Sequence, residues 1–269
     1  MTPPESDIRA RHPAVAGLFY PDDPYELRAV VRGYLDAAPA PAEAQPKALI
    51  VPHAGYVYSG PVAASAYRAL VGRSRSIERV VLAGPSHRVP VAGIALPSVA
   101  AFDTPLGRIP IDTATVQRLL ELPHVHASNL PHRMEHSLEV QLPFLQMTLE
   151  DFSLVPLAVG DAAPGTVATV LEACWGGPET LIVISSDLSH YRDYESARRI
   201  DAETARAIVG RADDLHDEQA CGCRVLNGLM RVARQRQLRV EMLDLRNSGD
   251  TSGDTARVVG YGAFALYGD

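Results

Sequence analysis

Three short apolar runs, each followed within a few residues by a histidine, most constrain how this chain can fold. They occupy residues 48–51, 79–84 and 180–185. Continuous apolar runs of this length indicate buried strands. Parallel strands of an open α/β sheet place their ligands just beyond their carboxyl ends. We therefore expect the residues that follow the three runs to meet at one edge of a sheet.

The side chains that reach this edge are those of a metal site. His53 and His87 follow the first two runs, and Asp187 and His190 follow the third. Imidazoles, a thiol and a carboxylate are the usual ligands of a transition metal. A buried histidine satisfied by backbone hydrogen bonds is the alternative for either imidazole alone. Two histidines at matching strand ends favour the metal site.

Cys221 is the third candidate ligand. It precedes a predicted helix, and a helix N-terminus favours thiolate over thiol. The alternative is a small buried hydrophobic residue, which is what most free cysteines are. Cys223 would point elsewhere and is not assigned a role. Asp187 and His190 suit an acid/base pair or groups that orient substrate, although Asp187 alone suits a turn cap.

The rest of the chain alternates helices with strands. Apolar spacing predicts helices over residues 25–37, 61–70, 112–122, about 165–175, 194–210 and 219–236, and one over 131–150 kinked at Pro143. Strands are expected at residues 153–159, 238–245 and 258–267, short strands within 91–112, and a loop over 247–254. Three further segments complete the chain. Residues 1–13 are a lead-in, residues 14–21 are an edge strand or an irregular segment, and residues 38–46 are a Pro/Ala connector. We predict one α/β domain over residues 1–269, a central, mostly parallel or mixed sheet flanked by helices.

The composition argues against several classes of function and location. The net charge of −7 argues against a nucleic-acid partner, which would need a concentrated basic surface. Three cysteines are too few for a disulfide framework and suit a reducing cytoplasm. Neither a signal peptide nor an apolar stretch of about 18 residues is found, so no membrane partner and a cytoplasmic location are expected.

A second motif offers a rival site. His132-Arg-Met-Glu-His136 fits the H-x-x-E-H pattern of zinc peptidases, in which two histidines of one helix bind zinc and a glutamate acts as base. So short a pattern also arises by chance in a chain with 9 histidines. The motif nevertheless keeps zinc among the candidate ions.

Six motifs together carry a resemblance to a known family. They lie at residues 14–21, 52–60, 84–90, 135–139, 185–190 and 221–222. In this order, and over nearly the whole chain, they resemble the Memo family. Residues 248–254 resemble its bacterial and archaeal branch, named after a gene trio of AMMECR, Memo and radical-SAM proteins. The resemblance thus implies an AMMECR-type protein and a radical-SAM protein as partners.

The resemblance also implies a fold and a pocket. The fold would be similar to class III extradiol dioxygenase B subunits, with a non-haem metal pocket formed by His53, His87 and Cys221. Dioxygenase relatives have a glutamate where Cys221 stands, and a soft thiolate favours copper or tunes iron differently. Phe19 would stand where animal members have a tryptophan, and His136 would lie at the pocket rim.

The leading hypothesis is an iron- or copper-dependent oxidoreductase, dioxygenase-like, that acts on a small organic substrate. His190 would be the general acid/base, positioned by Asp187, and Phe19, Tyr56 and His136 would line the pocket. One alternative is a non-catalytic module that binds a peptide or partner protein through a vestigial pocket. The other is a zinc hydrolase that uses the H-x-x-E-H motif.

Overall fold

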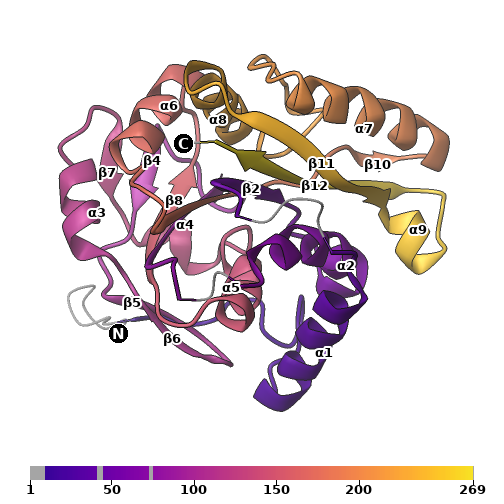
Figure 1. Ribbon diagram of the computed structural model, residues 1–269, viewed down its shortest axis with the longest axis horizontal. Helices are drawn as coiled ribbons and strands as arrows, with labels where there is room; N and C mark the ends of the chain where they lie inside the picture. Colours follow the sequence, from indigo (N-terminus) through magenta and orange to yellow (C-terminus); the bar gives the residue numbers. More distant parts are fainter. Residues whose placement is uncertain (1–9, 41–44, 73–74, 269) are drawn as a thin grey trace.

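The computed structural model describes residues 10–40, 45–72 and 75–268 (Figure 1). Residues 1–9 of the expected lead-in and 41–44 of the expected connector lie outside this part of the chain. Within it, one hydrophobic core reaches from Val15 to Tyr267. Both ends of the chain therefore contribute to the same core.

A mixed sheet forms the centre of the molecule. Its strands run in the order β10-β12-β2-β9-β3-β8-β4-β7, with β11 paired to β12, and β1, β5 and β6 form a smaller sheet. The strands are β1 (Ala10–Arg11), β2 (Ala48–Val51), β3 (Arg79–Pro85), β4 (Ile94–Leu96), β5 (Ala101–Thr104), β6 (Gly107–Pro110), β7 (Val125–Ala127), β8 (Ser153–Val159), β9 (Thr180–Ser185), β10 (His190–Arg192), β11 (Arg239–Asn247) and β12 (Val258–Tyr267).

The four central strands are parallel. β2 pairs with β9, β9 with β3, and β3 with β8, all in parallel register. All residues of β2 and β9, and all of β3 after its first, are buried. Parallel strands covered on both faces are expected to be continuously apolar, which is the pattern that predicted them. The predicted mixed α/β fold is confirmed.

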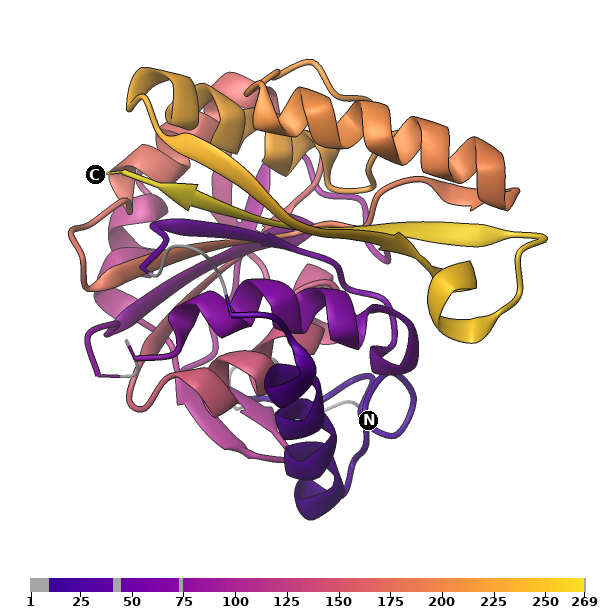
Figure 2. The same cartoon turned by 45° about the vertical axis from the view of Figure 1, so that its right-hand side comes forward.

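Helices cover both faces of this sheet (Figure 2). On one face α2 packs against β2, β11 and β12, and α1 packs against α2 and α5. On the other face α7 packs against β11 and β12, and α8 contacts β3 and α6. The helices are α1 (Pro24–Ala37), α2 (Tyr56–Tyr67), α3 (Thr113–Leu119), α4 (Leu130–Arg133), α5 (Leu142–Thr148), α6 (Pro164–Ala173), α7 (Tyr194–Val209), α8 (Cys223–Gln235) and α9 (Ser248–Ser252), with 3-10 turns η2 (Arg68–Leu70) and η3 (Glu139–Gln141).

Two helix predictions are corrected. Helix α2 begins at Tyr56, five residues before the expected start, and contains Pro61. The expected helix over residues 131–150 is broken into α4, η3 and α5, and Pro143 lies in the first turn of α5 rather than at a kink. Proline is tolerated in a first turn because its missing N–H would have no partner there. The break leaves residues 134–138 as a turn, and this turn carries His136.

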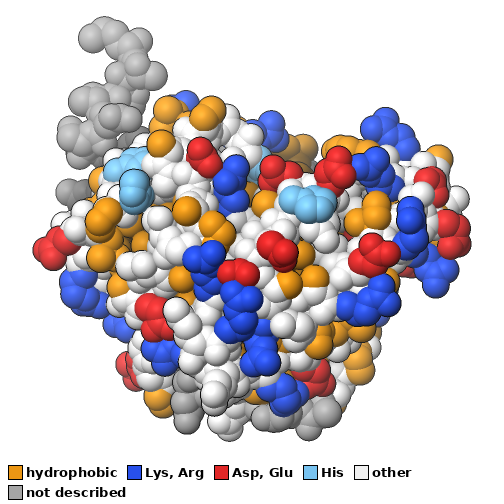
Figure 3. All heavy atoms as spheres, turned by 90° about the horizontal axis from the view of Figure 1, so that it is seen from above, with side chains coloured by type: hydrophobic (Ala, Val, Ile, Leu, Met, Phe, Trp, Pro, Cys, Tyr) orange, Lys and Arg blue, Asp and Glu red, His pale blue; other side chains and the backbone are white. Residues whose placement is uncertain are grey.

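The surface is mixed in charge. On the face seen from above the view of Figure 1, acidic and basic side chains are interspersed rather than separated by sign (Figure 3). None of the helices in the described ranges combines the length and the apolar character needed to cross a bilayer.

Candidate metal centre

Adjacent parallel strands bring two of the predicted histidines together. In the sheet order β9 lies between β2 and β3, so the carboxyl ends of the three strands are neighbours. His53 lies two residues after β2, and His87 two residues after β3. Their ring centroids are 5.1 Å apart, in an edge-to-face arrangement. Asp187 follows β9 and accepts the backbone N–H of His53 at 2.6 Å.

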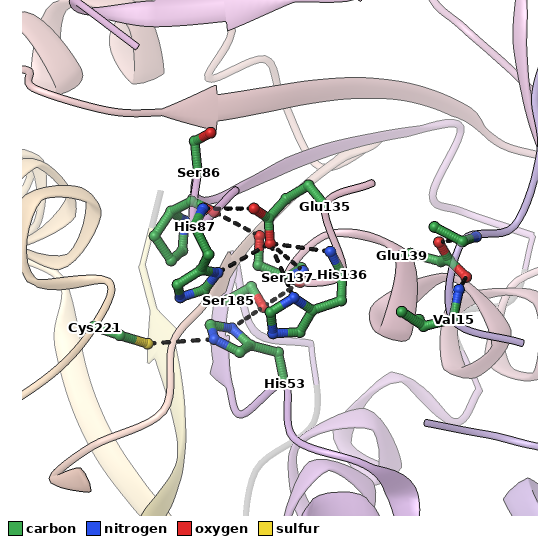
Figure 4. Close-up of polar contacts among 12 residues, drawn as sticks. Val15, His53, Ser86, His87, Glu135, His136, Ser137, Glu139, Ser185 and Cys221 are labelled. Carbon is green, nitrogen blue, oxygen red and sulfur yellow. Dashed lines mark hydrogen bonds and ion pairs between the residues drawn. The ribbon is translucent and has the colours of Figure 1, made fainter. Parts of the chain in front are cut away.

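A third histidine joins them from the turn at residues 134–138. The ring of His136 stacks on that of His87 at 4.9 Å and lies 5.4 Å from that of His53. One nitrogen from each of the three rings lies within 4.8 Å of the others. Nitrogens that share one ion at about 2.1 Å lie about 3–4 Å apart, so the three rings need only a small adjustment to bind the same ion. His136, expected at the pocket rim, is therefore a member of the cluster (Figure 4).

A chain of hydrogen bonds sets the tautomer of His53. The hydroxyl of Ser185 donates its single proton to the carbonyl of Ser137 at 2.6 Å and accepts from the Gln141 amide at 2.9 Å. Its remaining lone pair faces Nδ1 of His53 at 2.9 Å, so that Nδ1 must be the donor. Nε2 of His53 therefore carries the lone pair a metal needs.

Glu135 does the same for His87. Its Oε1 lies 2.9 Å from Nδ1 of His87, and its Oε2 accepts the backbone N–H of His87 at 2.5 Å. Burial alone would raise the pKa of this carboxyl, but the hydrogen bond and charge of His87 hold the pKa at about 2. A carboxylate behind a histidine fixes the ring and increases its basicity toward a metal. Glu135 thus orients His87 with Nε2 free.

A buried ion pair anchors the turn that carries Glu135 and His136. Arg11 pairs with Glu139 and donates to the carbonyls of His132 and Glu135 at 3.0 and 2.7 Å. Glu139 also accepts the hydroxyl of Tyr20 at 2.6 Å. Charged side chains without solvent exposure need this full set of partners to offset their desolvation. The N-terminal segment is therefore part of the support of the site.

Burial keeps two imidazoles of the cluster, those of His53 and His136, neutral. Burial, together with the nearby rings of His87, His136 and His190, lowers the pKa of His53 well below its ordinary value. Burial lowers the pKa of His136 to about 4. Nδ1 of His136 is buried without a hydrogen-bond partner among the described residues, 3.3 Å from Oε1 of Glu135. Neutral imidazoles with converging lone pairs and an unsatisfied buried nitrogen fit a transition-metal ion.

Cys221 borders the cluster on one side. Its Sγ lies 3.3 Å from Nε2 of His53 but falls outside the group of three nitrogens that are mutually within 4.8 Å. Helix α8 begins two residues later, and burial followed by the charge of Asp187 raises the pKa of the thiol. The expected helix effect is therefore outweighed by burial. Binding a metal through Cys221 requires the release of a proton.

Asp187 and His190 lie beside the cluster but do not form the expected pair. Nδ1 of His190 is 2.8 Å from the carbonyl of Leu188, while Asp187 accepts from the backbone of His53. Burial raises the pKa of Asp187 to about 7 and lowers that of His190. Asp187 shapes the turn after β2, and the backbone of Leu188 orients His190.

A cavity of about 480 Å³ opens beside the cluster and is lined by Phe19, His136, Asp187 and His190. Phe19 packs on His136 with ring centroids 4.9 Å apart. Tyr56, which we expected in the pocket lining, does not line this cavity. Its ring is buried and its hydroxyl donates to the carbonyl of Val140 at 2.7 Å. The early start of α2 turns Tyr56 into the core and brings Tyr58 to the cavity instead.

A second cavity, of about 280 Å³, borders the cluster from another direction. His87 and Cys221 line it together with Asp161 and Asp217. The two cavities have no lining residue in common.

The H-x-x-E-H motif does not form a zinc site of its own. Helix α4 ends at Arg133, so His132 and His136 do not share a helix face. Nε2 of His132 is 3.0 Å from the carbonyl of Ala95, and its ring packs edge-on against Phe102. His132 is a buried structural residue, while Glu135 and His136 belong to the cluster.

Comparison with known sequences identifies the family. A family model described as Memo-like protein matches residues 11–265. The chain belongs to the Memo family. MEMO1 family proteins of Thermotoga neapolitana, Aquifex aeolicus and Archaeoglobus fulgidus are 37%, 34% and 35% identical to it, over 93%, 94% and 93% of this chain and 97%, 98% and 97% of theirs.

A solved structure shares the fold. The crystal structure of uncharacterized protein JW3007 from Escherichia coli K12 covers 81% of this chain and 98% of its own, with a TM-score of 0.52 and 14% sequence identity. At this identity the likeness concerns the fold alone.

The sequence of this Memo-family chain did not reveal the residues that orient His53 and His87. Glu135 was considered only as a zinc-hydrolase base, and Ser185 and Gln141 were given no role. Ser185 lies two residues before Asp187 and is the last residue of the apolar run 180–185. A polar residue in such a buried run is a usable sign that its side chain has a specific partner. Gln141 carries no local signal, because its partners come from distant segments.

Proposed function

We propose that this Memo-family chain is a metal-dependent oxidoreductase that acts on a small organic substrate. The observation that supports the proposal most is the convergence of His53, His87 and His136, whose nitrogens lie within 4.8 Å of one another. For His53 and His87 the other nitrogen is already engaged by Ser185 or Glu135. Histidines held in this way are typical of metal ligands.

We propose one iron or copper ion, held by His53 and His87, with Cys221 or His136 completing the set. Imidazole suits both metals, and a thiolate adds a soft ligand. Such an ion, when bound, supplies one-electron chemistry that amino acid side chains lack. Because burial lowers the pKa of His53, this histidine can bind a cation without first losing a proton.

The remaining residues of the site would handle the substrate and its protons. Nδ1 of His190 faces the carbonyl of Leu188, which leaves Nε2 with a lone pair for proton transfer. Phe19 and His136 form one wall of the cavity. We propose that the substrate lies against this wall, with His190 as its general acid/base.

The test of metal binding is elemental analysis of protein purified without chelators. We expect about one iron or copper per chain in the wild type, and its loss in His53→Ala/His87→Ala. The matched control is His12→Ala/His126→Ala, which removes two exposed imidazoles that are not members of the cluster. Stoichiometric iron or copper retained in the first variant would overturn the assignment.

The test of redox activity is oxygen consumption by the metal-loaded protein with catechol-like compounds and other reduced phenols. We expect consumption that depends on the loaded metal and is lost in His53→Ala/His87→Ala. Absence of consumption across these substrates, at full metal occupancy, would reject the oxidoreductase and leave a binding module.

A further inference from the structure

Besides its histidines, the 480 Å³ cavity is lined by a second set of side chains, and Tyr191 of this set packs on His190 with ring centroids 5.7 Å apart. The set includes Tyr58, Tyr191, Tyr261 and Arg257. Tyr58 and Tyr191 are 41% and 64% exposed, so their rings are accessible to a ligand in the cavity. Aromatic walls with a few converging polar groups are typical of sites for small organic ligands.

Arg257 has no acidic partner in the described part of the chain. Its guanidinium lies over the ring of Tyr191, 5.1 Å from the centroid. Several other arginines of the described residues are paired at short distance, such as Arg79 with Asp112 at 2.6 Å. The neighbouring carboxylate of Asp254 accepts the backbone N–H of Ala256 at 3.0 Å and so stabilises the turn that precedes Arg257. The guanidinium is left free for a ligand.

The backbone at Tyr191 adds an independent observation. Tyr191 has a φ of 57°, in the left-handed region that non-glycine residues rarely adopt. The register of β10 against β12 shifts between His190 and Arg192, which is a bulge at Tyr191. In a regular strand, neighbouring side chains point to opposite faces. Here the bulge lets both His190 and Tyr191 line the same cavity.

We propose that Arg257 and Tyr191 form the anion-binding end of the substrate pocket, and that the substrate is a small aromatic or conjugated carboxylate. A guanidinium matches a planar carboxylate with two parallel hydrogen bonds, and the tyrosine hydroxyl adds a donor. The ring of the substrate would lie between Tyr58 and Phe19, with its other end toward His136 and His190. This inference rests on the proposed function for the reacting end only, since the anion contact needs no metal.

The experiment compares cinnamate with cinnamamide, which has the same shape without the charge. Binding is measured by isothermal titration calorimetry on the metal-loaded protein. We expect cinnamate to bind at least tenfold more tightly than cinnamamide. Arg257→Gln should reduce this ratio to about one, and Tyr191→Phe should reduce it a few-fold. Arg192→Gln is the matched control, because Arg192 lies on β10 near Glu218 and not in the cavity.

Three results would overturn the inference. The first is that the wild type binds cinnamate and cinnamamide equally well. The second is that the ratio of their affinities stays the same in Arg257→Gln. The third is that phenyl phosphate binds tenfold more tightly than cinnamate. The ratio is also measured in His53→Ala/His87→Ala, where we expect it to persist. If the metal proposal fails, the anion contact can still be correct. If the anion contact fails, the metal proposal is not affected.

Discussion

A single hydroxyl decides how His53 can act. Ser185 donates to Ser137, accepts from Gln141 and thereby compels Nδ1 of His53 to be a donor. All of these atoms are buried, where an unmade hydrogen bond costs about 1–3 kcal/mol. The orientation of His53 is therefore fixed by the protein before any ligand arrives.

His132 shows the opposite case, a histidine whose burial has a stability cost. Burial lowers its pKa from 6.5 to about 4. Between these values the unfolded chain binds a proton that the folded chain does not, so stability falls as pH falls through this window, by about 1.4 kcal/mol per pH unit. We expect metal-free wild type to lose about 3 kcal/mol more than His132→Gln between pH 7 and pH 4. Urea unfolding at several pH values measures this, and parallel pH profiles for the two proteins would contradict it.

The histidines themselves were accessible from the sequence to different degrees. His53 and His87 follow apolar runs directly, and strand adjacency was enough to pair them. His136 was predicted to lie on a long helix, because Leu138, Leu142 and Leu145 have helical spacing. It was expected only at the rim of the pocket. The buried charges of Glu135 and Glu139 outweigh that spacing, since both need partners that a straight helix could not offer.

At the scale of elements, the start of α8 sets the position of Cys221. Gly222 is the N-cap of this helix, and its N–H donates to Oγ of Ser186 at 2.9 Å. A Cβ at this position would lie 2.7 Å from Cβ of Ser186. The helix can approach the end of β9 only because residue 222 has no side chain.

Gly222→Ala should therefore push the start of α8 away from β9. We expect a loss of about 1–3 kcal/mol in unfolding free energy, the usual cost of overpacking, and weaker metal retention if Cys221 is a ligand. The control is Gly33→Ala in α1, where an added methyl would meet no atom within 4 Å and should stabilise the helix by up to about 1 kcal/mol. Urea unfolding compares the two, and an unchanged midpoint for Gly222→Ala would refute the account.

Element boundaries were the least predictable part of the fold. The start of α2 was missed because Pro61 suggested a first turn, whereas the N–H of Tyr56 already donates to the carbonyl of Phe19 at 2.7 Å. The Gly/Asp-rich segment 247–254 was expected as a loop, but Asn247 and Asp250 form a capping box that starts α9. Both signals involve contacts or caps that local composition does not reveal.

At the scale of the whole molecule, the three candidate metal ligands come from segments that are distant in the chain. His53, His87 and His136 follow β2, β3 and α4. The unfolded chain cannot present them together, so an ion would bind the folded state and stabilise it by mass action. At a free metal concentration 1,000 times Kd the gain is about 4 kcal/mol.

Removing the metal should then lower Tm by about 10 °C, at the roughly 2–4 °C per kcal/mol typical of chains near this size. Calorimetry before and after treatment with a chelator measures the shift. The His53→Ala/His87→Ala variant is the control, since a chelator should leave its Tm unchanged. A wild type whose Tm is indifferent to the chelator would argue against a resident ion.

The sheet was the part that sequence predicted best. Continuous apolar runs mark strands buried on both faces, and short polar endings mark the edge where they stop. The order of the strands could not be read in the same way, because it depends on which neighbours pair. The placement of β9 between β2 and β3 is what makes the two histidines adjacent.

The histidine cluster borders two cavities that share no wall. One is reached past Phe19 and His190, the other past Cys221 and Asp217. A molecule seated on the aromatic side leaves the sulfur side open to solvent. In the proposed reaction, two reactants would therefore have separate approaches to the same cluster, and neither would have to leave before the other could bind.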